Sequence, residues 1–536
     1  MSRFHSCAGF VFGTLLVVGA ACDPGTVHSE GDVGGGPVPC AELANFAAHG
    51  LVVESAEELL EPEPEINPYS GEPMPPLAPH CEVAGVIDDE IHFELRLPLP
   101  GAWNGRFAMG GGGGFVGSVL NGLLFPAPKT VPVLEAGYAT VGTDTGHQGS
   151  FIDASWALDN DVRERNFADR AVSVVAELSK EITEHHYGKP IDYSYFVGCS
   201  RGGGQAMIAS QRYPEAFDGI VAAAPAFSWP SIGAAMVQNS KAMYPDPTQL
   251  ETPVVTAENR ALLEREILKA CDGLDGVEDG VLTDPRACAF DPASLPRCDV
   301  RPEPGCMTEP QLDAIQTIYR GAELDGESLY PGFPFGGEND PEGWGPWITG
   351  GSQYALGPNP NLHYAFGTQI YKYLVFDDEA FDYATYDFAN WHRDVAASDE
   401  LLSAKDSDLS AFRDHGGKIV FWHGWSDPAL TALATIDYFD ALRRDTEGSD
   451  SFARLFMLPG VLHCAGGPGA DGVDWLARIA DWVENGNAPN RIVASRVATD
   501  GTTELTRALC PYPMVAEYDG AGDPNDEASY ACAGGS

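Results

Sequence analysis

The chain has 536 residues, a length that predicts one large domain or two of medium size. Apolar residues make up 44% of the chain, which is enough for a substantial buried core. The formal net charge is −47, and the acidic residues are spread along the sequence rather than gathered in one tail. Because such a surface repels phosphates, the composition argues against nucleic acid as a partner.

The N-terminus has the features of an export signal. Arg3 is followed by a short apolar run, FVFGTLLVVGA (10–20), which is too short to span a bilayer. Cleavage after Ala21 would remove residues 1–21 as a signal peptide and leave residues 22–39 as a flexible polar tether. Two alternatives stay open. Ordinary cleavage gives a secreted protein, whereas lipidation of Cys22, in the lipobox-like GAAC, gives a membrane-tethered periplasmic or outer-surface lipoprotein.

The cysteine count also indicates an exported protein. Of twelve cysteines, ten remain once Cys7 and Cys22 are set aside, an even number that predicts disulfide bonds in an oxidising compartment. The sequence contains no C-x-x-C pair, which argues against structural zinc.

From Cys40 onward, predicted strands and helices alternate. Strand-like runs occupy 84–100, 105–111 and 136–146, and a helix with apolar residues at helical spacing occupies 168–188. A strand that enters a tight glycine turn (191–200), a helix (202–214) and another strand (217–226) follow. This alternation predicts an α/β fold with a mostly parallel sheet.

The periodicity weakens between residues 228 and 409, a segment rich in proline and aromatic residues that we interpret as an inserted lid. The α/β pattern then resumes, with strands in 417–428 and 453–467 and helices at 429–445 and 474–486. We therefore predict one core domain formed by residues 40–227 and 410–536, and a lid domain formed by residues 228–409.

Three residues follow predicted strands in an order that indicates serine catalysis. Ser200 is the centre of Gly198-Cys199-Ser200-Arg201-Gly202, which fits the G-x-S-x-G nucleophile elbow and lies between a strand and a helix. Asp427 and His463 follow later strands, and the order Ser, Asp, His is that of the α/β-hydrolases. His423 is an alternative base, but it precedes the acid, so we interpret it as a histidine that positions its loop.

Cys199 and Cys464 stand directly beside Ser200 and His463. A disulfide bond between them would tie the nucleophile loop to the base loop and fix the geometry of the serine and the histidine. The alternative is that Cys199 is only a small buried residue that fills space.

Several motifs together resemble the tannase and feruloyl esterase family. They are GCSRGGGQA, HGWSDP and LHC, and segments such as WNGRFAMGGGGGFVG and QRYPEAFDGIVAAAPA extend the likeness from Cys40 to the C-terminus. The resemblance implies an α/β-hydrolase core and a serine carboxylic-ester hydrolase. With proximity in the sequence, it also implies five disulfide pairs: Cys199–Cys464, Cys40–Cys81, Cys271–Cys288, Cys298–Cys306 and Cys510–Cys532.

A tetrahedral oxyanion needs two backbone N–H donors. The N–H of Arg201, directly after the nucleophile, is the first candidate. The second is expected from the glycine run 110–114, where the resemblance favours Gly113. The alternative is that this run is only a flexible turn.

The segment CDGLDGVEDGV (271–281) places three carboxylates close together in the predicted lid. Closely spaced carboxylates suit a hard cation, and without one they would repel each other. The resemblance implies a structural Ca²⁺ bound by the side chains of Asp272, Asp275 and Asp279 and the carbonyls of Val277 and Val281. The alternative is a solvated acidic turn. No organic cofactor is expected.

The resemblance leaves the substrate open among feruloyl, galloyl and hydroxyethyl-terephthalate esters, all of which carry an aromatic acyl group. We expect a small aromatic ester or a plant-polymer-linked ester, with feruloyl esters first because of their breadth in the family. A non-catalytic binding protein and a peptidase on the same fold are the rival interpretations. The complete Ser-Asp-His set argues against the first, and the wide lid and the family likeness argue against the second. Nothing in the sequence indicates the oligomeric state.

Overall fold

The computed structural model describes residues 37–64, 66, 74, 76–119, 121, 132–298, 305–350, 357–498 and 500–534. The predicted signal peptide, Cys22 and nearly all of the predicted tether lie outside these residues, so the state of Cys22 stays a prediction. Within the described ranges, no helix is long and apolar enough to cross a membrane.

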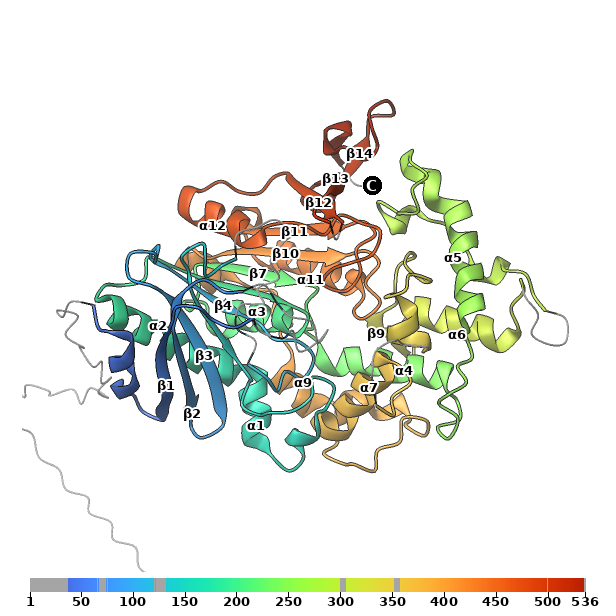
Figure 1. Ribbon diagram of the computed structural model, residues 1–536. Coiled ribbons are helices and arrows are strands. Elements are labelled where there is room, and N and C mark those ends of the chain that lie inside the picture. Colours follow the sequence, from blue (N-terminus) through green and yellow to red (C-terminus); the bar gives the residue numbers. More distant parts are fainter. Residues whose placement is uncertain are drawn as a thin grey trace, which may run out of the picture.

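A nine-stranded sheet runs through the molecule in the order β1-β2-β3-β5-β4-β6-β7-β10-β11 (Figure 1). The antiparallel edge consists of β1 (Leu51–Leu59), β2 (His80–Ile87) and β3 (Ile91–Pro98). The parallel part consists of β5 (Ala139–Thr143), β4 (Arg106–Gly110), β6 (Tyr193–Cys199), β7 (Gly219–Ala223), β10 (Lys418–Gly424) and β11 (Ala453–Leu458). The predicted α/β fold with a mostly parallel sheet is confirmed.

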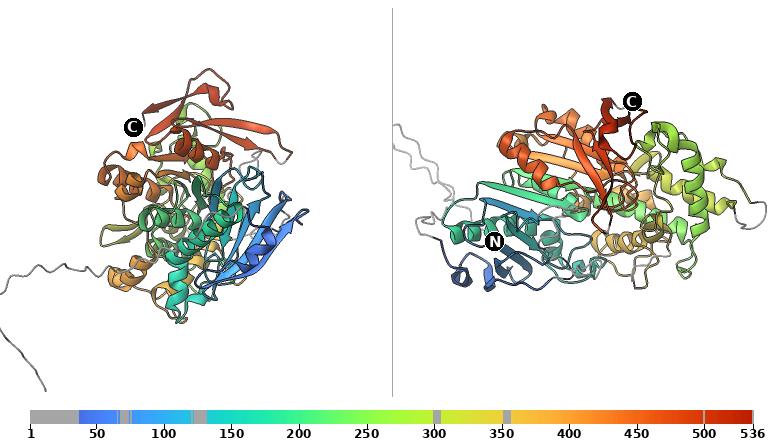
Figure 2. Two further views of the ribbon diagram at one scale, coloured as in Figure 1. Left: turned by 90° about the vertical axis from the view of Figure 1, so that its left-hand side faces the viewer. Right: turned by 45° about the horizontal axis from the view of Figure 1, so that its top comes forward.

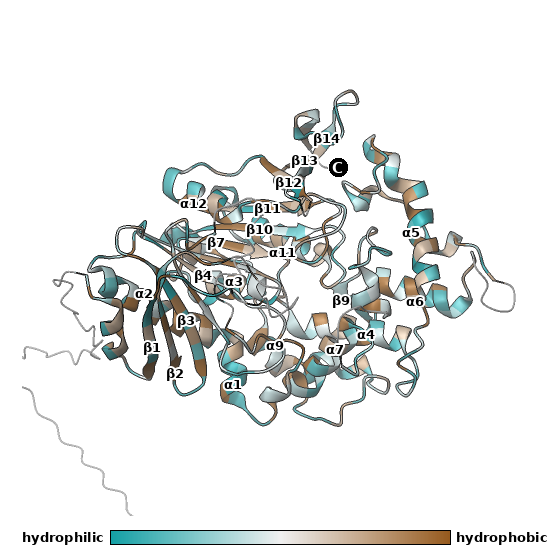
Figure 3. Ribbon diagram, viewed as in Figure 1, coloured by the Kyte–Doolittle hydropathy of each residue, from teal (hydrophilic) through white to brown (hydrophobic). Residues whose placement is uncertain are grey.

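Helices cover both faces of the parallel strands. Phe196 and Ile220 belong to a core that includes α2 (Ala171–Tyr187), α3 (Arg201–Arg212) and α11 (Ala432–Asp445). Their sequence neighbours Val197 and Val221 belong to a second core that includes α12 (Trp475–Asn485). This alternation follows from the two-residue period of a strand. Strand β7 is accordingly hydrophobic along its length (Figure 3).

Two predicted helices begin later than expected. Residues 166–170 form a π-helical turn after the short α1 (Asp161–Arg165), so α2 starts only at Ala171. Helix α11 starts at Ala432 because the side chain of Thr431 caps it, accepting a hydrogen bond from the N–H of Leu433. The residues before Thr431 form a turn instead of helix.

Most of the remaining helices lie in the chain between β7 and β10. They are α4 (Trp229–Met243), α5 (Ala257–Cys271), α6 (Glu309–Arg320), α7 (Leu362–Gln369), α8 (Trp391–Asp394), α9 (Ala396–Leu402) and α10 (Ser410–His415), with a hairpin of β8 (Gly321–Leu324) and β9 (Glu327–Pro331). Helices α5 and α6 share an apolar cluster of their own, whereas α4 and α7 join the core of the sheet. Figures 1 and 2 show α5 and α6 at the end of the molecule farthest from β1. The domain limits at 228 and 409 stay a prediction.

Two small hairpins at the C-terminus were not anticipated from the sequence. They are formed by β12 (Ile492–Val497) with β13 (Thr503–Leu509), and by β14 (Met514–Tyr518) with β15 (Tyr530–Gly534). Arg507 on β13 pairs with Asp279, so this C-terminal part is joined to the acidic loop after α5.

All five predicted disulfide pairs are present: Cys40–Cys81, Cys199–Cys464, Cys271–Cys288, Cys298–Cys306 and Cys510–Cys532. The pairings implied by the resemblance are thereby confirmed. Five disulfide bonds are consistent with an exported protein.

Candidate active site

Ser200 occupies a sharp turn between β6 and α3. Its φ of +85° and ψ of −109° lie in a region that non-glycine residues rarely adopt, at a cost of roughly 1–3 kcal/mol. Backbone hydrogen bonds hold this conformation. The Ser200 N–H donates to the carbonyl of Ala223 at 3.0 Å, and the Ser200 carbonyl accepts from the N–H groups of Gly204 and Ala226. The predicted nucleophile therefore sits at the C-terminal end of a central strand.

The glycines of the elbow are required by close packing of backbone on backbone. A Cβ at Gly198 would lie 2.5 Å from the carbonyl of Gly202, and a Cβ at Gly111 would lie 2.5 Å from the Cα of Gly202. Real Cβ atoms do not approach so closely, so the G-x-S-x-G spacing lets the glycine loop after β4 rest directly on the turn of the nucleophile.

The structure brings together the three residues predicted for catalysis. The Nε2 atom of His463 lies 2.9 Å from the Oγ of Ser200, and its Nδ1 atom lies 2.7 Å from an Oδ2 of Asp427. In this arrangement Nδ1 donates to the carboxylate, which leaves Nε2 free to accept the serine proton.

Asp427 is buried, and its carboxylate is fully engaged. Its Oδ1 atom accepts hydrogen bonds from the N–H groups of Ala429 at 2.8 Å and Leu430 at 3.0 Å. Burial by itself would raise the pKa of this carboxyl, but the charge of His463 and the hydrogen bonds from His423 and His463 outweigh it and hold the pKa below its ordinary value. The carboxylate is thus kept ionised to orient the imidazole.

His423 contacts the same carboxylate oxygen as His463. Its Nε2 atom lies 3.0 Å from Oδ2 of Asp427 and 3.0 Å from the carbonyl of Leu430, both of which are acceptors, so Nε2 carries the proton. Its Nδ1 atom lies 2.8 Å from the hydroxyl of Thr435. This geometry agrees with our interpretation of His423 as a histidine that positions its loop. That His423 and His463 contact one carboxylate oxygen was not predicted from the sequence.

The two candidate oxyanion donors border the same space as Ser200. In the glycine run, the N–H of Gly111 donates to the carbonyl of Val197, and that of Gly112 donates to Oε1 of Gln205. Gly113 and Gly114 line the cavity beside Ser200 and Arg201. The register favoured for the second donor, Gly113, is therefore compatible with the structure, although Gly114 lies beside it.

The side chain of Arg201 is buried behind the nucleophile. Its guanidinium packs over the ring of Phe167 at 4.1 Å and donates to the carbonyls of Phe167 and Ala168. Burial lowers the pKa of this guanidinium to about 9, an effect that the charge of Asp169 partly offsets. Only the backbone N–H of Arg201 is thus a candidate for contact with a substrate.

A cavity of about 490 Å³ opens above Ser200. One side, which we call the sheet wall, consists of Gly113, Gly114, Ser200, Arg201, His463 and Cys464. A second group of lining residues, which we call the lid wall, is apolar and consists of Trp229, Ile232, Met236, Trp347, Leu362, Phe366 and Ile370. The ring of Trp347 meets the ring of His463 edge-on, with centroids 5.0 Å apart. The sequence predicted a lid but did not identify these residues.

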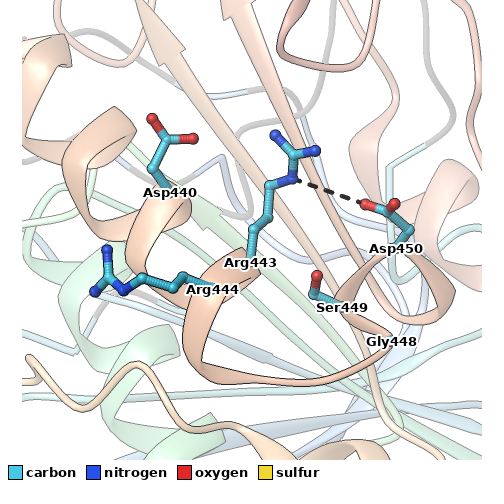
Figure 4. Close-up of a pocket in the computed structure, with 6 residues that line it drawn as sticks. All are labelled: Asp440, Arg443, Arg444, Gly448, Ser449 and Asp450. Atoms are coloured by element: carbon cyan, nitrogen blue, oxygen red, sulfur yellow. Dashed lines mark ion pairs between the residues drawn. The ribbon is translucent and has the colours of Figure 1, made fainter.

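A second hollow lies at the C-terminal end of α11 (Figure 4). It is lined by Asp440, Arg443, Arg444, Gly448, Ser449 and Asp450. Arg443 faces Asp450 across 4.0 Å, and none of the three predicted catalytic residues borders this hollow. Its exposed, self-paired charges fit a solvated surface better than a reaction centre, so we assign the candidate site to the apolar cavity.

The carboxylates of the predicted calcium loop are turned to different partners. Asp272 accepts from the N–H of Gly280, Asp275 accepts from Val277 and Thr283, and Asp279 accepts from Val281 and pairs with Arg507. In the described part of the chain, no three His, Cys, Asp or Glu side chains converge as a metal site. The oxygen donors suit Ca²⁺, but their present arrangement does not form a cage for it.

The fold class and the family of the protein can now be stated. The fold and the site geometry define an α/β-hydrolase. Residues 78–533 match the family model described as "Tannase and feruloyl esterase", and the chain belongs to that family and is a carboxylic ester hydrolase.

Relatives and solved structures agree with this assignment. The chain is 33% identical over 530 residues to a mono(2-hydroxyethyl) terephthalate hydrolase of Piscinibacter sakaiensis, covering 85% of each chain. It is 34% identical over 472 residues to a probable feruloyl esterase of Arthroderma benhamiae, covering 83% of each. The crystal structure of feruloyl esterase B from Aspergillus oryzae matches with a TM-score of 0.79 at 26% identity, covering 91% of this chain and 98% of that one.

Proposed function

We propose that the protein hydrolyses esters of aromatic acids, feruloyl esters first, through an acyl-enzyme on Ser200. The observation that carries this proposal is the hydrogen-bonded series Ser200–His463–Asp427 at the floor of an apolar cavity. An apolar pocket of this kind removes an aromatic acyl group from water and leaves the ester carbonyl beside the nucleophile.

The reaction follows from the positions of the donors and acceptors. His463 Nε2 accepts the Ser200 proton as Oγ attacks the ester carbonyl, and the N–H groups of Arg201 and Gly113 stabilise the oxyanion. His463 then gives this proton to the leaving alcohol. In the second half, His463 takes a proton from water as the water oxygen attacks the acyl carbonyl. The bond between the acyl carbon and Ser200 Oγ then breaks, the acid leaves, and His463 returns the proton to Oγ. Asp427 holds the imidazole throughout.

A hydroxyethyl-terephthalate ester is the second candidate substrate, because the relative of that activity is 33% identical over most of this chain. A galloyl ester is the third. The lid wall accommodates the aromatic ring of each, so the apolar lining supports the acyl class and does not rank its members.

The proposal is tested by hydrolysis of methyl ferulate, methyl gallate and mono(2-hydroxyethyl) terephthalate, with the released acid followed by chromatography. Wild-type protein and Ser200→Ala are compared, with Ser210→Ala on the same helix as a matched control. We expect release that is lost in Ser200→Ala and kept in Ser210→Ala. No release by folded wild-type protein would overturn the proposal and favour a binding protein on the same fold. Cleavage of amides as readily as esters would favour a peptidase.

We also propose that residues 272–281 bind a structural Ca²⁺ through Asp272, Asp275 and Asp279, with the carbonyls of Val277 and Val281. Burial raises the pKa of Asp272, and repulsion from Asp279 and Asp275 adds to this, which is the situation that a cation would relieve. A bound ion would stabilise the folded state and takes no part in the reaction. We expect EDTA to lower the melting temperature, Ca²⁺ to restore it, and Asp272→Asn/Asp275→Asn to respond to neither. An unchanged melting temperature in EDTA would contradict calcium binding and would favour the alternative, a solvated acidic turn.

The finer details of export are likewise a proposal. We propose that the chain is exported with cleavage before Cys22, either as a secreted protein or as a lipoprotein. The intact mass of the mature protein distinguishes the two, because a lipidated Cys22 adds acyl chains that Cys22→Ser cannot carry.

A further inference from the structure

The charges around the cavity bear on which esters the protein prefers. This inference rests on the proposed function. The lid wall is apolar, and the described residues that border the cavity include one carboxylate, that of Glu342. Glu342 lies in the lid, two residues before Trp344, and its side chain is exposed to solvent.

Glu342 lies beside the loop that carries the base. Its backbone N–H donates to Oδ1 of Asp340 at 2.9 Å, which fixes the turn from which the side chain extends. Its Oε2 atom lies 3.0 Å from the position that a Cβ on Gly466 would take. Gly466 follows His463 by three residues, so a carboxylate from the lid stands at the edge of the cavity on the side of the catalytic histidine.

Among the described residues that line the cavity, no Lys or Arg side chain is available to offset the negative charge of Glu342 and attract an anionic ligand. Arg201 borders the cavity, but the residue is only 1% exposed, and its guanidinium donates to the carbonyls of Phe167 and Ala168 and has Asp169 near it. The Trp229 ring, which lines the cavity, packs 5.4 Å from this guanidinium. A carboxylate on a ligand in this cavity would therefore be repelled by Glu342, while the buried guanidinium of Arg201 is engaged elsewhere, and the overall charge of −47 adds to the repulsion.

We propose that Glu342 is a specificity-determining residue that selects against esters carrying a free carboxylate. The preferred substrates are then esters of uncharged hydroxyaromatic acids, and monoesters of aromatic dicarboxylic acids are disfavoured. The chain would thus differ in substrate preference from its terephthalate-monoester-hydrolysing relative, despite their similarity over most of the sequence.

The test uses two substrates that share the same scissile bond. Mono(2-hydroxyethyl) terephthalate carries a carboxylate across the ring, whereas bis(2-hydroxyethyl) terephthalate carries a second ester there. The measured quantity is kcat/KM for the monoester divided by kcat/KM for the diester, in which the twofold statistical advantage of the diester is the same for every variant. The full-length mature protein is compared with Glu342→Gln, Glu342→Lys and Glu251→Gln, the last an exposed acid of the lid that does not border the cavity.

We expect a ratio below one in the wild type. Glu342→Gln should raise it about two- to fivefold and Glu342→Lys by more, since a solvent-exposed charge pair changes an equilibrium by up to roughly fivefold. The change should shrink at high salt because the charges are screened. Glu251→Gln should leave the ratio as it is.

The proposal is overturned if the ratio in folded Glu342→Gln and Glu342→Lys equals that of the wild type, or if Glu251→Gln shifts it as much as Glu342→Gln. In either case the esterase assignment stands, because the diester is still cleaved. If the wild type cleaves neither these esters nor methyl ferulate, the proposed function itself fails. The two failures are therefore distinguishable.

Discussion

The two walls of the cavity are built on different physical principles. On the sheet wall, Ser200 and His463 are fixed by directional hydrogen bonds, by close glycine packing and by a disulfide bond between their loops. On the lid wall, apolar side chains from α4, α7 and the turn at 345–349 meet the substrate space without such bonds. The difference teaches that the catalytic residues are held by a few directional constraints, whereas the apolar part of the cavity is formed by the packing of several side chains.

The largest effect is expected on the sheet wall, from Asp427→Asn. An asparagine would present an amide to His463 Nδ1 and favour the wrong tautomer, so we expect kcat to fall by about 10⁴-fold. His423→Gln should lower kcat only about tenfold, because His423 acts through Asp427 and does not accept the proton of Ser200.

Single-turnover hydrolysis of methyl ferulate measures both variants, with melting temperatures to show that they are folded. Equal losses in kcat would contradict this order and would give His423 a direct part in proton transfer.

The second effect concerns the disulfide bond of the sheet wall. Cys199 and Cys464 are 265 residues apart, so removing their bond should lower the free energy of unfolding by about 5 kcal/mol in the chain-entropy model. The matched control, Cys298→Ala/Cys306→Ala, opens a bond that spans 8 residues and should cost about half as much.

Urea unfolding of the two double variants checks this prediction, and hydrolysis checks whether only the first variant loses activity. If the short bridge matters as much as the long one for stability, the chain-entropy account of this bond is wrong.

The third effect concerns a buried carboxyl group close to the loops of Asp427 and His463. Gly337 lies against Ser426 and Leu462, the neighbours of Asp427 and His463, and the next residue, Glu338, is fully buried. Tyr319 and the N–H of Gly336 donate to one oxygen of Glu338. Burial, reinforced by the charge of Glu264, raises the pKa of Glu338 to about 7.

Because the folded pKa of Glu338 is raised, the folded state keeps a proton that the unfolded chain loses above pH 4.5. The free energy of unfolding should therefore fall as the pH rises from about 4.5 to about 7, by about 3 kcal/mol in all, at 1.4 kcal/mol for each unit of pKa. Asp144 and Glu164, whose pKa values burial raises to about 6 and about 7, add to the decline, so Glu338→Gln should reduce it by about this amount and Glu251→Gln should leave it unchanged. Parallel unfolding profiles for wild type and Glu338→Gln across this range would refute the prediction.

The smallest effect is expected on the lid wall, from Trp347→Ala. Loss of one apolar ring should lower kcat/KM for methyl ferulate by roughly tenfold, because part of the acyl group stays in water. Methyl acetate, whose acyl group is too small to reach far along the wall, should be affected much less. An equal loss for both esters would mean that Trp347 acts by orienting His463, which its ring touches edge-on.

The same contrast explains what could be predicted from the sequence. Ser200, Asp427 and His463 were found because each follows a strand in a fixed order, and because a strained turn of this kind needs glycines at fixed spacing. The lid wall was not found, since its residues are ordinary apolar ones whose meeting depends on the packing of α4 against α7. The second hydrogen bond to Asp427 was also missed, because only the turn after β10 brings His423 back onto it.

The long segment that we predicted to be a lid joins β7 to β10, which are adjacent parallel strands. In topological terms it is an enlarged connection of an ordinary βαβ crossover, and α10 returns the chain to the start of β10. Residues within this connection can be inserted, lost or exchanged over evolutionary time without changing the register of either strand. One scaffold can in this way keep the same catalytic residues while its substrate specificity diverges. The mechanism and the specificity can therefore evolve separately.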